Sequence, residues 1–158
     1  MSTTQALQIH CKPLPGLMHF RGANMASILE KNDAADLQIF QYRKLSDDRF
    51  IANLGAEEIY FCVDAAESLE LQANQYAFPR ADATFELSGN WKALMSEVCI
   101  YDFRQSQPGD FLMVSIAGVS AWLLIPEADE PLILGCDPTF GHYFQEILMK
   151  QIEESPFL

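Results

Sequence analysis

Two side chains of this sequence, Cys99 and His142, have the types needed for nucleophilic catalysis. A thiol becomes a strong nucleophile when a neighbouring base, such as an imidazole, takes its proton. No local signature of a thiol enzyme surrounds Cys99, however, and Cys99 directly follows Val98 at the end of an apolar stripe with helical spacing. We therefore predict that Cys99 packs in the core. We interpret Cys136 in the same way, as a strand-end thiol that packs under a helix.

The spacing of the residues gives little indication of a metal site or of a phosphate-binding loop. A metal site needs convergent His, Cys or carboxylate ligands, and the adjacent His10 and Cys11 are followed by no second pair at ligand spacing. Gly22 and Gly89 are single glycines outside any phosphate-binding pattern. Three carboxylate pairs lie in turn-like or terminal segments, where we expect solvated surface: Asp47 with Asp48, Glu57 with Glu58, and Glu153 with Glu154.

Arg21 is the charged residue with the most informative position, because it ends a short apolar run and precedes Gly22. A helix-flanking or ion-paired arginine explains this position. A binding role is the alternative, in which Arg21, Trp91 and Trp122 line a small-molecule pocket between two halves of the chain. From residue types and spacing alone, we predict no catalytic, cofactor-binding or metal-binding residue.

The balance of charges limits the partners of the chain. Ten Lys and Arg residues stand against 22 Asp and Glu, so the formal net charge is −12. The phosphates of a nucleic acid would be repelled by this charge. Solubility accounts for the acidity, and a complementary basic partner is the alternative.

The cysteines and the N-terminal segment indicate a compartment. Cys11, Cys62, Cys99 and Cys136 form no CxxC pair, and we expect free thiols, as in a reducing environment. The segment 1–16 lacks an apolar stretch of signal-peptide length, and no apolar run reaches the ~20 residues of a membrane span. We therefore predict a cytoplasmic protein with neither membrane nor nucleic-acid contacts.

The first half of the chain, residues 1–80, is predicted to be an α+β half. We expect a loose leader over 1–16, a helix over 23–32 and a short helix within 66–79. Apolar and β-branched runs predict strands in four further segments: 17–20, 37–45, 49–54 and 58–65.

The second half, residues 81–158, repeats this order within one compact unit. A strand over 83–89 leads to a helix capped by Ser88 or Asn90, whose apolar stripe is Trp91, Leu94, Met95 and Val98. Strands follow over 111–116, 119–125 and 131–136. Asp137 and Pro138 begin a last helix, with an expected buried face of Phe140, Phe144, Ile147 and Leu148. The tail 154–158 either is disordered or docks on a neighbouring chain.

The two halves can be aligned with each other. Residues 20–37 match 87–103 when Ala23 is treated as an insertion, which pairs Gly22 with Gly89 and Asp36-Leu37 with Asp102-Phe103. The identities are few, and chance is the competing explanation. The shared order predicts an α+β fold of two pseudo-repeated βαβ-type halves, with helices packed on antiparallel sheets.

Several short motifs, taken in order, resemble the gamma subunit of heterotetrameric sarcosine oxidase and, more distantly, the N-terminal part of the glycine-cleavage aminomethyltransferase. In the second half they are LSG (87–89), CIYDF (99–103), PGDF (108–111), AGVSAWLLI (117–125) and LILGCDPTFGHYFQEIL (132–148). In the first half they are HFRG (19–22) and NLGAEEIYFCV (53–63). The resemblance spans about residues 17–150 and implies an aminomethyltransferase-like, folate-binding type of fold.

The resemblance also implies a function. In that family this chain would be a non-catalytic subunit of a multi-subunit flavoprotein that oxidises N-methyl amines such as sarcosine. FAD, FMN, NAD, tetrahydrofolate and zinc would be bound by the partner subunits, and none by this chain. The aminomethyltransferases carry an Asp-Asp pair after the hairpin glycine, whereas residues 118–122 here contain no carboxylate, so we do not carry folate binding over.

Two other functions stay open at this point. The chain could be a stand-alone, folate-like small-molecule binding protein related to aminomethyltransferases, and a homo-oligomer if it is solitary. It could also be a stand-alone hydrolase or thiol enzyme that uses Cys99. Whether the chain has partner subunits separates the first function from these two.

Overall fold

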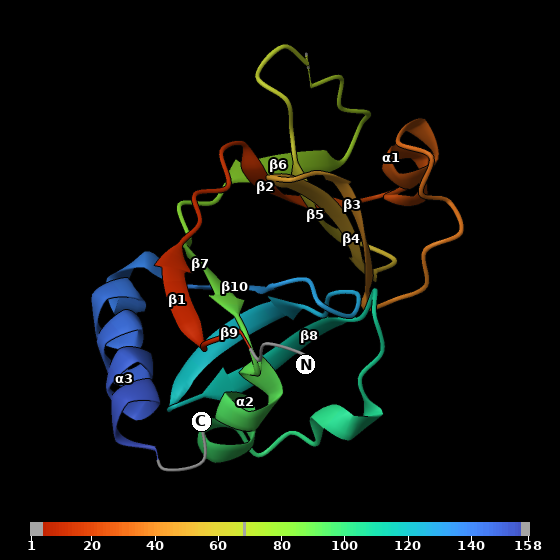
Figure 1. Cartoon of the computed structure of the whole chain (residues 1–158). Helices are drawn as coiled ribbons and strands as arrows, with labels where there is room; N and C mark the ends of the chain where they lie inside the picture. The colour runs from red at the N-terminus through yellow and green to blue at the C-terminus, as the bar shows by residue number, and fades with distance from the viewer. Residues whose placement is uncertain (1–4, 68, 156–158) are drawn as a thin grey trace. The chain divides into compact units, whose positions relative to one another are not determined.

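The computed structural model describes residues 5–67 and 69–155, which form two compact units. Unit 2 consists of Leu14–Ala81, and unit 1 combines Met1–Pro13 with Asp82–Leu158. Figure 1 shows a sheet in each unit, with α1 beside that of unit 2 and α2 and α3 beside that of unit 1. Within the described residues, no helix has both the length and the apolar character to cross a membrane.

Unit 2 is a five-stranded antiparallel sheet with one short helix. Its strands have the order β3-β4-β5-β2-β6 in the sheet. They are β2 (Leu17–Gly22), β3 (Gln41–Ser46), β4 (Arg49–Gly55), β5 (Glu58–Cys62) and β6 (Gln75–Pro79), and the helix is α1 (Ala26–Lys31). Ile28 and Leu29 of α1 pack on the sheet residues Phe20, Ile59 and Phe61 to form its core.

Unit 1 is a second five-stranded antiparallel sheet, in the order β1-β7-β10-β9-β8. Its strands are β1 (Gln8–Cys11), β7 (Ala83–Ser88), β8 (Phe111–Ile116), β9 (Val119–Leu124) and β10 (Leu132–Cys136). Its helices are α2 (Trp91–Val98), η1 (Phe103–Gln105), η2 (Pro138–Phe140) and α3 (Gly141–Glu154). Trp91, Leu94 and Met95 of α2 and Phe144 and Leu148 of α3 are buried in one hydrophobic cluster.

The helix starts of unit 1 follow the local chemistry of their first residues. Asn90 caps α2 by accepting a hydrogen bond from the Ala93 N–H at 3.4 Å, which decides between the two predicted caps. Asp137 accepts from the Thr139 N–H at 2.9 Å, and Pro138 follows it at the start of η2. Both side chains satisfy a backbone donor that has no partner within its helix.

The two units share one topology, which confirms the predicted α+β class with two pseudo-repeated halves. In unit 2 the strand before the helix, β2, lies between β5 and β6, and in unit 1 the strand before α2, β7, lies between β10 and β1. The remaining strands follow in the same way, as β5-β4-β3 and as β10-β9-β8. Gly22 and Gly89 occupy equivalent turns with φ of 118° and 93°. At each glycine a Cβ would run into backbone, at Asn74 before β6 and at Leu7 before β1, so both positions require glycine.

Three local predictions are wrong. The leader expected over 1–16 contains β1, which pairs with β7 as an outer strand of unit 1. The segment 66–79, where we expected a short helix, instead holds β6, paired with β2. Phe140 is 51% exposed rather than part of the buried face of α3, because it ends η2 before α3 turns its apolar side to the sheet. The tail 156–158 lies outside the described residues.

Candidate functional site

Three of the four cysteine thiols are buried. Cys62, Cys99 and Cys136 are buried, and Cys11 is exposed. Burial raises the pKa of Cys62 to about 11 and that of Cys136 to about 11. A thiol with so high a pKa carries almost no thiolate at neutral pH and is a poor nucleophile.

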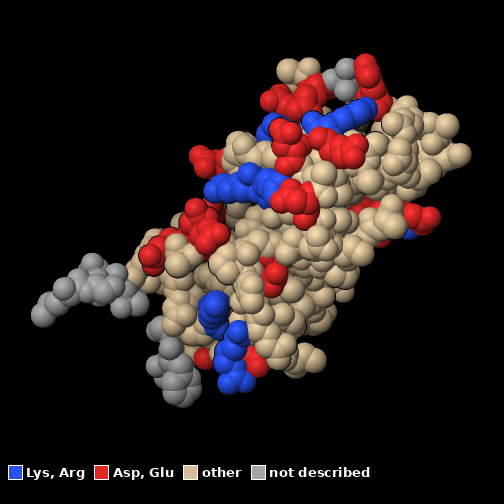
Figure 2. Space-filling view, turned by 90° about the vertical axis from the view of Figure 1, so that its right-hand side faces the viewer, with Lys and Arg blue, Asp and Glu red and all other residues tan. Residues whose placement is uncertain are grey.

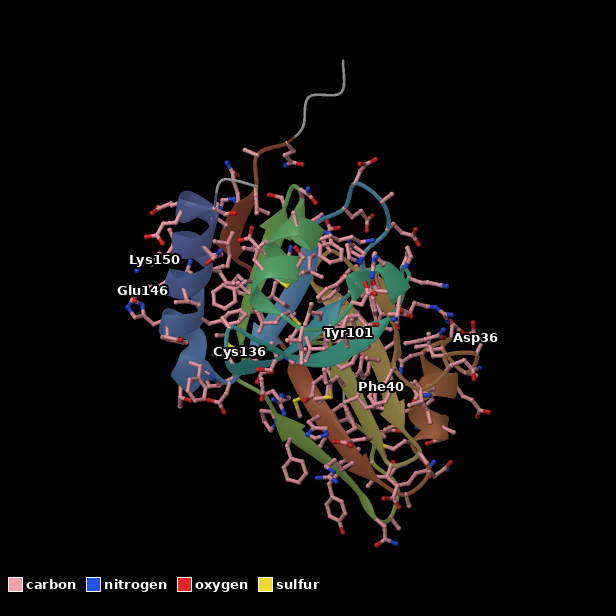
Figure 3. The ribbon with its side chains drawn as sticks, turned by 90° about the horizontal axis from the view of Figure 1, so that it is seen from below. Asp36, Phe40, Tyr101, Cys136, Glu146 and Lys150 are labelled. Carbon is pink, nitrogen blue, oxygen red and sulfur yellow. The ribbon has the colours of Figure 1, made fainter. Side chains whose placement is uncertain are left out.

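Cys99 and His142 lie in different environments of unit 1. Cys99 follows the last residue of α2 and belongs to the buried hydrophobic cluster. His142 lies on the solvent side of α3, where its Nε2 is 3.1 Å from Glu146 Oε1 in an exposed i,i+4 pair. Figure 3 shows Glu146 and Lys150 projecting from α3 away from the sheet. The structure therefore gives Cys99 the packing role predicted for it and gives His142 a surface role.

The carboxylates contribute surface pairs. Within the described ranges, no group of three or more His, Cys, Asp or Glu side chains is placed to hold a metal ion. Asp47 lies 3.8 Å from Lys44 on an exposed turn, and Glu153 and Glu154 are exposed at the end of α3. On the face shown in Figure 2, acidic and basic side chains are intermixed.

One polar cluster of unit 2 lies on the sheet face opposite α1. His19 Nε2 is 2.7 Å from Glu58 Oε1, and the His19 ring meets the Tyr60 ring edge-on at 5.0 Å. The Arg80 guanidinium lies 4.8 Å from the centre of the Tyr60 ring. Burial lowers the pKa of His19 below its ordinary value of 6.5, although Glu58 acts in the opposite direction. At neutral pH, His19 is therefore a neutral hydrogen-bond donor to Glu58.

Two equivalent aspartates of the repeat each hold an arginine. Asp36 Oδ2 accepts from Arg43 at 2.7 Å, and Asp102 Oδ2 accepts from Arg104 at 2.8 Å. The hydrogen bonds from Arg104 lower the pKa of Asp102 to about 2. The apolar residue after each aspartate, Leu37 or Phe103, is buried. In each unit the aspartate and the apolar residue after it therefore fix the segment that follows the helix, and their role is structural.

A groove of about 860 Å³ runs along one side of unit 1. Its walls include His10 of β1, Glu86 of β7 and the start of α2 at Asn90 and Trp91. The loop 126–131 between β9 and β10 also lines the groove and contributes three acidic side chains. The groove is large enough for a small molecule, and no pattern in the sequence indicated it, since its walls come from separate segments.

The three residues proposed for a pocket between the halves have separate surroundings. Arg21 is exposed on β2 of unit 2. Trp91 packs edge-on against Phe103 in unit 1. Trp122 stacks on Phe111, and its indole N–H donates to Asp82 at 2.8 Å. Both tryptophans are therefore core residues of unit 1.

Similarity to known proteins is found at the level of structure. Neither a family model nor a curated protein sequence matches this chain. A chain of heterotetrameric sarcosine oxidase from Corynebacterium sp. U-96, solved with pyrrole 2-carboxylate, matches with a TM-score of 0.74 and 13% identity over 97% of this chain and 87% of that one. The glycine cleavage system aminomethyltransferase T from Bartonella henselae matches with a TM-score of 0.70 and 12% identity over 92% of this chain, which spans 46% of that protein. At these identities the likeness shows a shared fold.

Proposed function

We propose that this chain is a non-catalytic assembly subunit of a multi-subunit flavoprotein that oxidises N-methyl amines such as sarcosine. The observation that carries the proposal is the fold likeness to a chain of heterotetrameric sarcosine oxidase, which covers nearly the whole of both chains. The aminomethyltransferase, by contrast, is more than twice as long as the region that matches. The likeness to the sarcosine oxidase chain therefore extends over more of the matched protein, and this supports the proposal.

The chemistry of the described side chains agrees with a supporting role. The thiol considered as a nucleophile is buried in the core, and the aligned aspartates hold arginines that fix the chain locally. Under this proposal the flavins, the nicotinamide dinucleotide and tetrahydrofolate belong to partner subunits, and the complex is cytoplasmic. This chain would act by packing against those subunits.

Affinity purification from the native organism tests the proposal. A tagged copy of the chain should recover flavin-containing subunits, identified by mass spectrometry and by the flavin absorbance of the eluate. Recovery of the tagged chain alone, from cells grown on an N-methyl amine, would count against an assembly role.

The groove of unit 1 favours a second candidate, a folate-like small-molecule binding protein. Trp91 contributes to the wall of this groove, so a ligand seated there would change the tryptophan fluorescence. Titration with tetrahydrofolate tests this candidate. Binding in the groove predicts a saturable change in tryptophan fluorescence, and Trp91→Phe should reduce that change. A flat titration would reject this candidate.

A further inference from the structure

One end of the unit 2 sheet presents an unusual set of side chains on a single face. The register places Tyr76 of β6 beside Arg21 of β2, and Arg21 beside Glu58 of β5. Residues directly opposite each other in an antiparallel pair project on the same face. Two residues along, the next row of the same face is Phe78, His19 and Tyr60.

The exposure of the side chains on this face increases from β5 to the outer strand β6. Tyr60 is buried, whereas Tyr76 and Phe78 on the outer strand are 55% and 52% exposed. Arg21 is exposed and, among the described side chains, takes part in no hydrogen bond or ion pair. The register thus leaves the exposed Arg21 guanidinium between Tyr76 on one side and Glu58 on the other, while Glu58 Oε1 is hydrogen-bonded to His19 at 2.7 Å.

Hydrogen bonds from buried and part-buried side chains support the strands of this face. Gln75 at the start of β6 is buried, and its side-chain amide donates to the Ala23 and Asn24 carbonyls at 2.9 and 3.0 Å. The hydrogen bond between His19 and Glu58 fixes the neighbouring strands at the same place. The backbone that carries Tyr76 and Phe78 is therefore held in place by hydrogen bonds. This lowers the conformational entropy that the chain would lose on binding a partner.

The free edge of β6 is not available for adding another strand. The Arg80 N–H faces β2 and donates to the Leu17 carbonyl. Because backbone groups alternate in direction along a strand, those of the neighbouring Pro79 face the free edge. Proline has no N–H to offer, and it is a common means of protecting an edge strand. A partner would thus bind the face of the sheet rather than its edge.

The geometry points to the face formed by Arg21, Tyr76 and Phe78 as the docking surface for a protein partner that presents an Asp or Glu side chain flanked by apolar residues. Tyrosine and arginine are the residue types that most often dominate binding energy at protein interfaces. The unpaired guanidinium of Arg21 matches a carboxylate in charge and in bidentate geometry. The aromatic rings on β6 match the apolar flanks.

This inference rests on the proposed function, because it takes the partner to be a flavoprotein subunit. The first experiment measures the Kd of that purified subunit for the wild-type chain and three variants. Tyr76→Ser with Phe78→Ser, and Arg21→Ala, should each weaken binding about tenfold or more. Arg21→Glu should weaken it further, since it opposes a carboxylate with a like charge.

A matched control uses Tyr143, which is 50% exposed on α3 of unit 1. Tyr143→Ser should leave the Kd unchanged. Circular dichroism and the thermal midpoint of every variant report folding separately, and these surface changes should leave both near the wild-type values. Equal loss of binding in the control would mean that the effect is not specific to this face.

A second experiment identifies the facing carboxylate directly. Arg21→Lys keeps the positive charge and introduces an amine, which a carbodiimide can join to a carboxylate in contact with it. Mass spectrometry should find a cross-link from position 21 to an Asp or Glu of the flavoprotein subunit, and Arg21→Gln should give none. A complex that forms without this cross-link contradicts the predicted pairing.

The outcomes separate the two proposals. If the wild-type chain recovers a flavoprotein and the Arg21 and Tyr76/Phe78 variants bind it equally well, the docking surface is wrong and the assembly function stands. If the wild-type chain recovers no flavoprotein, both the assembly function and this docking partner are rejected. Loss of binding confined to the face variants supports both.

Discussion

The environments of the four cysteines predict an order of reactivity. Cys11 is exposed on an outer strand, whereas Cys62, Cys99 and Cys136 are buried. We expect a disulfide reagent at pH 8 to modify Cys11 quickly and the other three only as the protein unfolds, because the reagent cannot reach a buried sulfur in the folded chain. The measurement is the amplitude of the fast phase, and Cys11→Ser should abolish it. A fast phase that survives in Cys11→Ser would contradict the burial of the remaining thiols.

Asp102 gives a prediction about acid stability. The hydrogen bonds from Arg104 lower its pKa from the ordinary 3.8 to about 2. A carboxyl group whose pKa is lower in the folded chain stabilises the fold above its unfolded pKa, and this contribution is lost as the pH falls through the folded value. The wild-type chain should therefore be more stable than Asp102→Asn at pH 6, and the difference should disappear between pH 3.8 and about 2.

Urea denaturation of both proteins across this range measures the effect, and taking the difference cancels the other carboxyl groups. Because Asp102 is only partly buried and its partner Arg104 is exposed, the difference should be small. A difference that stays constant down to the lowest pH would show that the stabilisation comes from the shape of the side chain and not from its charge.

At the scale of elements, the cap of α2 can be tested against the alternative that the sequence left open. Asn90 accepts the Ala93 N–H, and Ser88 instead ends β7. Asn90→Ala should lower the free energy of unfolding by about 0.5–1 kcal/mol, near the lower end for caps because the bond is long at 3.4 Å. Ser88→Ala is the matched control and should cost clearly less, as judged by urea denaturation. A larger loss in Ser88→Ala would reverse the assignment of the cap.

The elements that sequence reasoning found and those it missed differ in physical terms. The stripe Trp91, Leu94 and Met95 predicted α2 because a helix that packs on a sheet must bury one face. β1 and β6 were missed because each is an outer strand with little buried surface and thus with weak alternation of apolar residues. Their pairing depends on long-range contacts with β7 and β2. The face around Arg21 was missed for the same reason, since it includes β6.

At the scale of the whole molecule, the chain contains one sheet-and-helix arrangement twice. In each unit the apolar helix faces pack on the sheet of the same unit, whereas Tyr76 and Phe78 of β6 are exposed. The predicted repeat is supported by the shared strand order and by the equivalent glycines, which no single motif in the sequence could establish.

Anaerobic addition of sarcosine to the assembly purified through this chain tests the central claim most directly. The account predicts that the flavin absorbance of the assembly bleaches as the amine is oxidised, and that the isolated chain is colourless and leaves sarcosine unchanged. An isolated chain that binds flavin and oxidises sarcosine without a partner would contradict the non-catalytic role. An assembly that lacks flavin would contradict the function itself.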